Sequence, residues 1–320
     1  MAPRQEKPRF LELLADLVSG IEEPPHPGRG RKPVPIGDRI FAVCYKVWSE
    51  KSSMRFDGDL QQAIADGYIS RPIHPNKVHS FMEDAELTPY LKAMIVRSSL
   101  PLKAIETEFA VDSSGFTTSR FVRWYDHKYG VTRQEHDWIK VHIACGVNTH
   151  VVTAAAIYGR DANDCPIMPE LVAQTAENFT VDAFSADKAY LSVDNVEEVF
   201  NAGGIPFIAP KSNTTGGVGG KFEKMFHFYL YKREEFLKNY HKRSNIESCF
   251  SVVKRKFGDH IRSKTATAGI NEVLCKLLCQ NIWAVILSQA ELGIEAEFWR
   301  DEQDSHPDNG PVILSLARPG

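Results

Sequence analysis

Four polar side chains lie at helical spacing in one stretch of the chain, YHKRSNIESCFSVVKRKFG, residues 240–258. They are Tyr240, Arg243, Glu247 and Lys254, at offsets of zero, three, seven and fourteen residues. Residues three, four and seven apart share a face of an α-helix, so all four are predicted to point the same way. A separate apolar stripe follows the same periodicity and is predicted to face the core: Ile246, Phe250 and Val253. The predicted helix thus sets one carboxylate among cations and an aromatic hydroxyl.

Two aspartates end apolar, β-rich runs elsewhere in the chain. Asp112 ends EFAVD and Asp187 ends DAFSAD, each where apolar residues give way to small and polar ones. A single aspartate in such a place is more often a cap or turn former. Two in equivalent positions, together with Glu247, suggest three converging carboxylates, which repel one another unless a cation lies between them. Mg²⁺ prefers such oxygen ligands, and two ions can stabilise the attacking and leaving oxygens of a phosphodiester.

At these residues the chain resembles a known family. The pattern Y-x₂-R-x₃-E-x₆-K is matched without a gap, and AVDSSGF and ADKAY resemble the two aspartate segments of the bacterial and archaeal insertion-sequence DDE transposases with a Y-R-E-K signature. The aspartates lie 75 residues apart, the second lies 60 residues before the glutamate, and the resemblance spans about 105–290.

The resemblance implies a ribonuclease H-like α/β fold with a mixed sheet flanked by helices. It also implies that Asp112, Asp187 and Glu247 bind Mg²⁺ or Mn²⁺, as two ions, and that the enzyme cuts and joins DNA. Three further residues would contact phosphates near the end of the mobile element: Tyr240, Arg243 and Lys254. Only 211–233 is available for an insertion before the glutamate helix, so a long insertion domain is not expected.

Composition and hydrophobic periodicity divide the chain into four parts. Residues 1–35 are rich in Pro, Gly and charge and are predicted to lack order. Residues 36–100 have helical periodicity and form the candidate module for recognising DNA ends. Residues 101–290 read as three strands, a helix, a strand, a helix and a fifth strand, then the basic helix and a final apolar helix, which predicts a mixed α/β catalytic domain. The acidic tail, 291–320, is predicted to be disordered.

Composition sets the broad class. The chain has 320 residues, of which 43% are hydrophobic and 25% charged, as in globular proteins. Its six cysteines include no C-x-x-C pair, so a zinc site or a disulfide framework is not expected. No apolar run approaches the length of a membrane span, and the charged N-terminus lacks the apolar core of a secretory signal. These features favour a reduced, cytoplasmic protein, associated with the nucleoid when bound to DNA.

Charge is unevenly distributed along the chain. The net charge is −3, yet residues 211–264 contain thirteen Lys or Arg and five Asp or Glu, a local charge of +8 that leaves −11 elsewhere. A basic stretch on an acidic chain is typical of a surface that binds a polyanion, although a solvated face has the same composition.

Several other side chains are weaker candidates. Lys140 and His142 share a face of a predicted strand and could border the site, although a structural histidine is the more frequent outcome. Asp161 and Asp164 could support it, but Asp164, just before Pro166, has the sequence context of a helix cap. Trp138 could stack on a base or pack in the core.

The sequence favours a transposase that binds the double-stranded ends of its own element and inserts them into target DNA. Joining two ends requires two neighbouring active sites, which favours a homodimer on DNA. Two alternatives remain open at this point: a ribonuclease H-like nuclease that cuts without joining, and a repurposed DNA-binding protein without catalysis. Three intact carboxylates argue against the second.

Overall fold

The computed structural model describes residues 5–25, 28, 32–118, 138–158, 163–212 and 214–299. The chain divides into two compact units. The helical unit combines Met1–Pro101 with Ser263–Gly320, and the sheet unit is Leu102–Arg262.

The helical unit has one long helix and five shorter ones in its described part. They are α1 (Glu6–Ser19), α2 (Ile36–Ser49), α3 (Ser53–Ala65), α4 (Pro75–Met82), α5 (Leu87–Ser99) and α12 (Ala266–Leu292). A short 3-10 helix, η1 (Leu100–Leu102), follows α5. Helix α12 reaches α4 and α5 through two asparagines, since Asn271 donates to the Met82 carbonyl at 2.9 Å and Asn281 donates to the Ile95 carbonyl at 3.0 Å.

The prediction that residues 1–35 lack order was wrong for α1. This helix buries six apolar residues, and Phe10 stacks on Trp48 of α2 with ring centres 4.8 Å apart. The Pro- and Gly-rich composition belongs to the residues after Ser19, while EKPRFLELLADLVS carries an ordinary amphipathic period.

The two compact units divide the chain differently from the predicted domains at the C-terminal end of 101–290. Helix α12 was expected within the catalytic domain, 101–290, but it groups with the N-terminal helices. Residues 291–299 of the predicted disordered tail are described, and there Phe298 is buried and the Arg97 guanidinium lies 4.3 Å from the centre of the Trp299 ring. Residues 300–320 lie outside the described residues.

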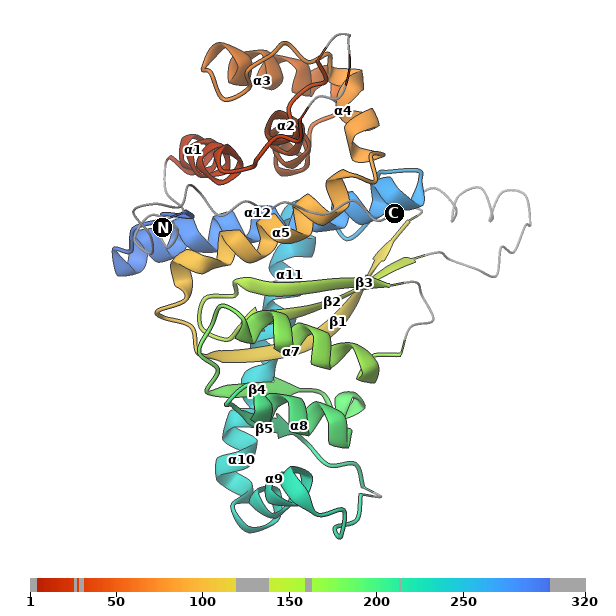
Figure 1. The fold of residues 1–320 in the computed structure, drawn as a ribbon, viewed down its shortest axis with the longest axis vertical. Coiled ribbons are helices and arrows are strands. Elements are labelled where there is room, and N and C mark those ends of the chain that lie inside the picture. The colour runs from red at the N-terminus through yellow and green to blue at the C-terminus, as the bar shows by residue number, and fades with distance from the viewer. Residues whose placement is uncertain are drawn as a thin grey trace, which may run out of the picture. The chain divides into compact units, whose positions relative to one another are not determined.

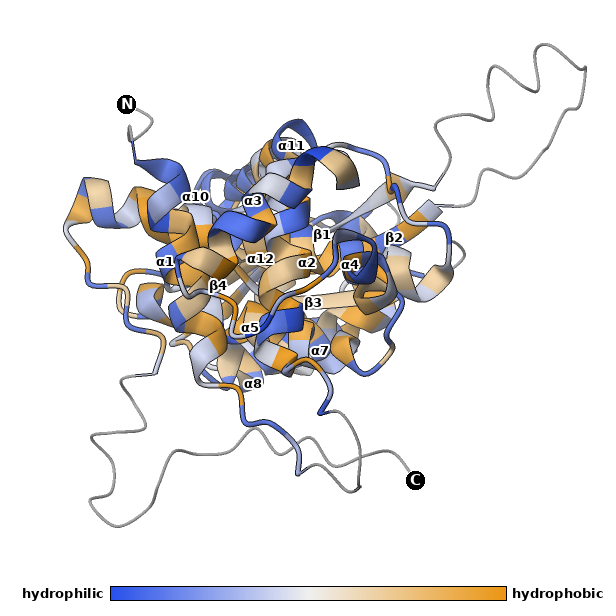
Figure 2. Cartoon of the chain, turned by 90° about the horizontal axis from the view of Figure 1, so that it is seen from above, coloured by the Kyte–Doolittle hydropathy of each residue, from blue (hydrophilic) through white to orange (hydrophobic). Residues whose placement is uncertain are grey.

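Helix α12 passes a length and composition test for a membrane span, which the sequence reading did not anticipate. Its most apolar window has a mean hydropathy of 1.4, and 83% of that window is buried. The core helix of a soluble protein passes the same test, so the finding is weak evidence for a membrane. Figure 2 shows apolar residues along much of α12, whereas hydrophilic and hydrophobic residues alternate along α11 (Ser244–Phe257).

The sheet unit contains a five-stranded mixed sheet (Figure 1). Its strands are β1 (Glu108–Thr117), β2 (Trp138–Gly146), β3 (Val152–Tyr158), β4 (Ala183–Ala186) and β5 (Ile205–Ile208), in the spatial order β3-β2-β1-β4-β5. The first three are antiparallel neighbours, while β4 pairs parallel with both β1 and β5. All five predicted strands are present in the predicted order, and the topology confirms the ribonuclease H-like fold.

Helices cover both faces of this sheet. In Figure 1, α7 (Met168–Ala176) and α8 (Val193–Asn201) lie in front of the strands and α11 passes behind them. Before α11 come α9 (Gly220–Tyr231), α10 (Arg233–Tyr240) and the 3-10 helix η4 (His241–Arg243). Two more 3-10 helices follow strands β3 and β4: η2 (Cys165–Ile167) and η3 (Lys188–Tyr190). The predicted insertion, 211–233, thus contains a single described helix, α9.

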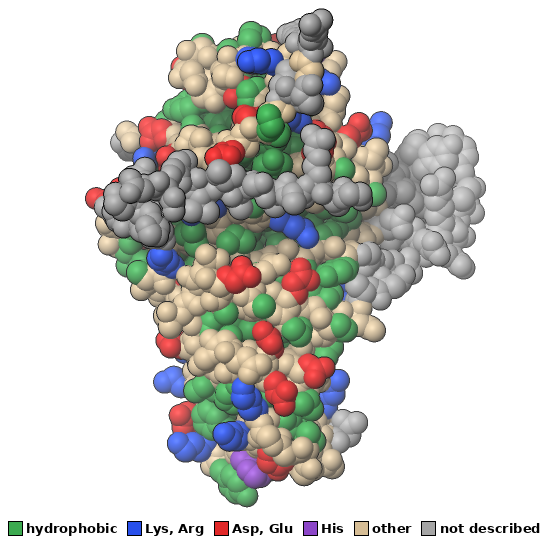
Figure 3. Space-filling model, viewed as in Figure 1, with side chains coloured by type: hydrophobic (Ala, Val, Ile, Leu, Met, Phe, Trp, Pro, Cys, Tyr) green, Lys and Arg blue, Asp and Glu red, His purple; other side chains and the backbone are tan. Residues whose placement is uncertain are grey.

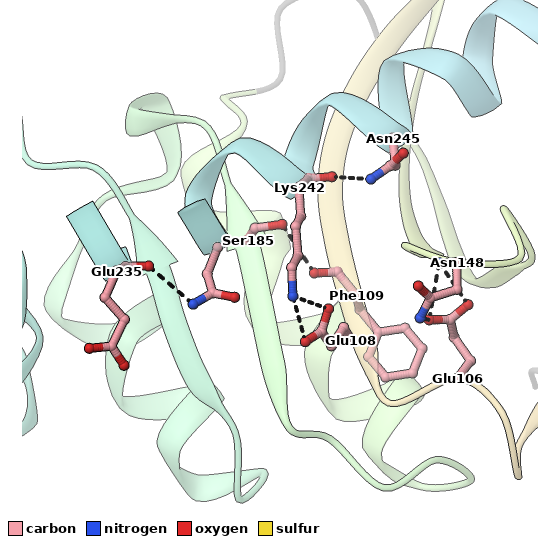
Figure 4. A network of polar contacts seen from close by, with 9 residues as sticks. Glu106, Glu108, Phe109, Asn148, Ser185, Glu235, Lys242 and Asn245 are labelled. Atoms are coloured by element: carbon pink, nitrogen blue, oxygen red, sulfur yellow. Dashed lines mark hydrogen bonds and ion pairs between the residues drawn. The ribbon is translucent and has the colours of Figure 1, made fainter. Parts of the chain in front are cut away.

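A buried carboxylate fixes the turn between β2 and β3. Glu106 is fully buried, and its oxygens accept from the backbone and side chain of Asn148 at 3.0–3.3 Å (Figure 4). They also accept from the backbone and side chain of Thr149 at 2.9 and 2.8 Å. Gly146 lies against this carboxylate, since a Cβ there would come within 2.5 Å of the Glu106 side chain. The turn therefore depends on both residues, at the end of the sheet away from the candidate site.

Candidate active site

Asp112, in the middle of β1, and Asp187, directly after β4, are next to each other where the parallel pairing of the two strands ends. The β1–β4 register pairs Glu108 with Ala183 and continues to Val111 with Ala186. One step further along both chains come Asp112 and Asp187. Because adjacent strands lie about 4.8 Å apart, the two backbones are close although 75 residues separate them in sequence.

Two lysines attach η4 and α11 to strand β1. Lys242 of η4 contacts both carboxylate oxygens of Glu108 at 2.7 and 2.6 Å, at the start of the strand (Figure 4). Lys254 of α11 donates to the Ser114 hydroxyl at 2.8 Å, near its end. The two lysines are twelve residues apart, about 18 Å along a helix. Their partners are six residues apart, about 20 Å along a strand, so α11 runs alongside β1.

The chain after α11 continues this attachment. Thr117 donates from its backbone N–H to the Asp259 carbonyl at 3.2 Å and accepts from the Ile261 N–H at 2.8 Å. Glu247 lies in the first turn of α11, between the two lysines that contact β1. It therefore lies alongside the strand that contains Asp112.

The three carboxylates lie close enough to affect one another. The pKa of Asp112 is raised, first by burial and then by the negative charges of Asp187 and Glu247. The Ser113 N–H, which donates to Asp112 Oδ1 at 2.8 Å, and the Arg243 guanidinium oppose that shift. The structure thus brings together the three acids that the sequence singled out.

Arg243 and Tyr240 lie among these acids. The Arg243 guanidinium is 3.2 Å from Glu247 Oε1 and 5.5 Å from the centre of the Tyr240 ring. The Tyr240 hydroxyl donates to Asp187 Oδ1 at 3.4 Å. The predicted single helix is in fact α10, η4 and α11 in succession, so Tyr240 ends one helix and Arg243 precedes the next. Arg243 thus lies as a counterion among the acids.

No three His, Cys, Asp or Glu side chains within the described ranges are arranged to enclose an ion. Glu247 instead contacts Arg243 and remains 59% exposed, which leaves its carboxylate accessible. The nearby acids supply only carboxylate oxygens, the ligand type that hard divalent cations take.

The weaker candidates have different outcomes. Asp164 precedes η2, but its side chain makes no cap hydrogen bond, so the capping prediction was wrong. It lies 2.5 Å from the Lys140 ammonium and 3.6 Å from His142 Nδ1, and His142 is fully buried. Trp138 is 46% exposed at the start of β2. Asp161 lies outside the described residues.

Sequence reasoning missed the anchors Lys242, Glu108 and Ser114. Each has an ordinary strand or helix context, and only the long-range contacts reveal it. The local charge of +8 was visible in sequence, and Figure 3 shows Lys and Arg side chains at the α9 end of the sheet unit, with acidic side chains over its middle.

Comparison with known proteins assigns the family. The family model described as the transposase DDE domain matches residues 103–282, more than half of the chain. A solved structure, the piggyBac transposase synaptic complex with hairpin DNA, is similar with a TM-score of 0.44 and 10% identity, over 91% of this chain and 78% of that one. No curated protein matches the sequence. The chain therefore belongs to the family of transposases with a DDE domain, DNA-binding enzymes that cut DNA and transfer its strands.

Proposed function

We propose that this transposase cuts and joins the ends of its own mobile element at a site built from Asp112, Asp187 and Glu247. The observation that carries this proposal is the β1–β4 register, which makes the two aspartates neighbours. The charge of Glu247, on α11, also acts on Asp112. The raised pKa of Asp112, which follows burial and the charges of the other two acids, supports a shared function. Mutual repulsion of this kind is relieved when a cation binds between carboxylates.

Members of this family use divalent metal ions, and the ions here would be Mg²⁺ or Mn²⁺, as a pair. The donor set fits, because all three candidate ligands are carboxylates and Glu247 is accessible. When bound, such ions stabilise the charges on the attacking and leaving oxygens of a phosphodiester.

The remaining polar residues bind and orient DNA in this proposal. Arg243 would exchange Glu247 for a phosphate, which a guanidinium can bind through two parallel hydrogen bonds. Tyr240 would orient the same phosphate from beside Asp187. Lys254 would contact the backbone further along the duplex, near Ser114.

The rest of the chain has two further roles in the proposal. Helices within 36–100 would recognise the element's ends, and two chains would form a dimer on DNA so that both ends are processed together. The protein would act in the cytoplasm, at the nucleoid, where its substrate lies.

The decisive test combines cleavage, joining and binding on DNA that flanks the coding region. Glu247→Gln keeps the size of the side chain but removes the charge that would hold an ion. It should abolish Mg²⁺-dependent cleavage and strand transfer while gel-shift affinity and the melting temperature stay at wild-type values. Glu234→Gln, on the exposed surface of α10, is the matched control and should leave all four measurements unchanged.

Two outcomes would contradict the proposal. A folded Glu247→Gln protein that cuts at the wild-type rate would remove Glu247 from the site. A wild-type protein that cuts labelled ends without joining them would instead be a nuclease.

A further inference from the structure

A second group of polar side chains lies on the face of β1 opposite to Asp112. Successive residues of a strand point to opposite faces, and directly paired residues of neighbouring strands share a face. Ser113 therefore points away from the Asp112 face and lies beside its partner on β2, His142. We call this group the rear cluster; its members are Ser113, Lys140, His142, Asp164 and Tyr190.

Asp164 and His142 connect the rear cluster. Asp164 Oδ1 accepts from the Ser113 hydroxyl at 3.3 Å and lies 2.5 Å from the Lys140 ammonium. The same oxygen is 3.6 Å from His142 Nδ1, and that nitrogen is 3.3 Å from the Tyr190 hydroxyl. The contacts thus join β1, β2, the residue before η2 and the end of η3.

The buried part of the rear cluster lowers the stability of the core. His142 and Tyr190 are at most 1% exposed. Among the described residues, His142 Nε2 is buried without a hydrogen-bond partner. A buried polar group left unpaired is destabilising, so an apolar core at this place would be more stable. The arrangement therefore favours a role other than stability.

The rear cluster touches the segments of both aspartates. Ser113 follows Asp112 directly, and its backbone N–H donates to Asp112 Oδ1 at 2.8 Å while its hydroxyl donates to Asp164. Tyr190 lies three residues after Asp187, and its N–H donates to the Asp187 carbonyl at 2.9 Å. One network, buried at His142 and Tyr190, thus reaches the backbone at both positions from behind.

We propose that Asp164 and Tyr190 are positioning residues, which hold the Asp112 and Asp187 carboxylates at the spacing that a divalent ion requires. The inference rests on the proposed function of those aspartates. Asp164 acts through Ser113 on the orientation of Asp112, and Tyr190 acts through its own turn on Asp187. Neither residue contacts the ion or the DNA.

The test measures Mn²⁺ binding to the full chain without DNA, by electron paramagnetic resonance, together with the melting temperature of the metal-free protein. Tyr190→Phe removes only the buried hydroxyl. It should weaken Mn²⁺ binding on the order of tenfold to a hundredfold, the range found when a partner of a metal ligand is removed. Asp164→Asn, at a half-exposed position, should have the same effect and provides a second variant if Tyr190→Phe fails to fold.

Tyr158→Phe is the matched control. Tyr158 lies on β3 of the same sheet, and its ring packs edge-on against His142 with ring centres 6.2 Å apart. Its hydroxyl donates to Glu170 at 3.0 Å and contacts no member of the rear cluster among the described residues. The same atom is removed, so Mn²⁺ binding should stay at the wild-type value.

A double-mutant cycle identifies the route. If Asp164 acts through Asp112, Asp164→Asn should weaken Mn²⁺ binding in the wild-type chain and have no further effect in Asp112→Asn, because effects through one residue are not additive. Additive losses would overturn that route.

The outcomes separate this inference from the proposed function. If Asp112→Asn itself leaves Mn²⁺ binding unchanged, the proposed site fails. If Asp112→Asn weakens binding but Tyr190→Phe and Asp164→Asn do not, the positioning role is overturned and the proposed site stands. Variants that only lower the melting temperature, with wild-type Mn²⁺ affinity in the folded protein, would likewise overturn it.

Discussion

The ammonium of Lys254 donates to the hydroxyl of Ser114 at 2.8 Å, two residues beyond Asp112 on the same strand. This partner is neutral, and no carboxylate of the described residues lies within 4.0 Å of that ammonium. Burial lowers the pKa of Lys254, while the charge of Asp259 opposes the shift. A half-buried cation without a paired carboxylate is ready to accept a phosphate.

Lys254→Ala should therefore weaken binding to element ends and reduce the dependence of log K on log salt concentration by roughly 1, as expected for one lost phosphate contact. Ser114→Ala should change neither quantity, because the ammonium keeps its charge. Gel-shift titrations at several salt concentrations measure both, with Lys238→Ala on the exposed side of α10 as the control for charge. An unchanged slope in Lys254→Ala would mean that this contact only attaches the helix.

Arg243→Ala should move two measurements in opposite directions. Without DNA, Mn²⁺ should bind more tightly, because the guanidinium that contacts Glu247 and repels a cation is gone. With DNA, cleavage should fall on the order of a hundredfold, since a small misplacement of the reacting phosphate has that effect on the rate. Manganese titration and single-turnover cleavage test the two arms, and Arg243→Lys should lie between wild type and Arg243→Ala in both. A parallel loss in both would show that Arg243 maintains the fold of the site.

His142 should make the protein less stable in mild acid. Burial lowers its pKa from 6.5 to about 4, against the opposing charge of Asp164. Between those pH values the unfolded chain binds a proton that the folded chain does not, so the stability present above pH 6.5 is lost as the pH falls. The loss approaches about 3 kcal/mol near pH 4.

Urea unfolding from pH 7.5 to 4 measures this loss. His142→Gln removes the titrating group, so its free energy of unfolding should fall less steeply across the same range, even where its absolute stability is lower. Identical pH dependence in the two proteins would mean that His142 is protonated in the folded state.

Glu106→Gln should destabilise the sheet unit without touching the active site. The substitution sets an NH₂ donor among the Asn148 and Thr149 groups that now donate to a carboxylate. About 2 kcal/mol of the free energy of unfolding should be lost, the cost of leaving a buried donor unpaired. The Mn²⁺ affinity of the folded protein should be retained, and a reduced affinity would show that this turn also holds the site.

Much of the fold could be read from local patterns. The five strands are short β-rich runs, and the acidic and basic residues of α11 follow helical spacing, so both were predicted. The adjacency of Asp112 and Asp187 depends on the β1–β4 register across 75 residues, which no local pattern specifies. Helix α12 is buried on nearly every side, so its periodicity does not indicate which unit it joins.

Predictions from local sequence were wrong at two places where tertiary contacts determine the structure. Asp164 has the context of a helix cap, but Lys140 and Ser113 engage its carboxylate instead. Helix α1 was not predicted, because the composition of residues 1–35 as a whole is dominated by the Pro-rich stretch that follows the helix.

The division of the helical unit between the two ends of the chain has a consequence for the order of synthesis. Residues 1–101 emerge from the ribosome first. Helix α12, which contributes to their core, is synthesised only after the whole sheet unit. The last strand of the sheet unit ends at Ile208 and α11 ends at Phe257. The sheet unit can therefore fold before α12, which packs with α1 to α5, has been synthesised. A nascent chain thus gains its cutting domain before its helical domain, and closing the helical domain requires the chain to span 161 intervening residues.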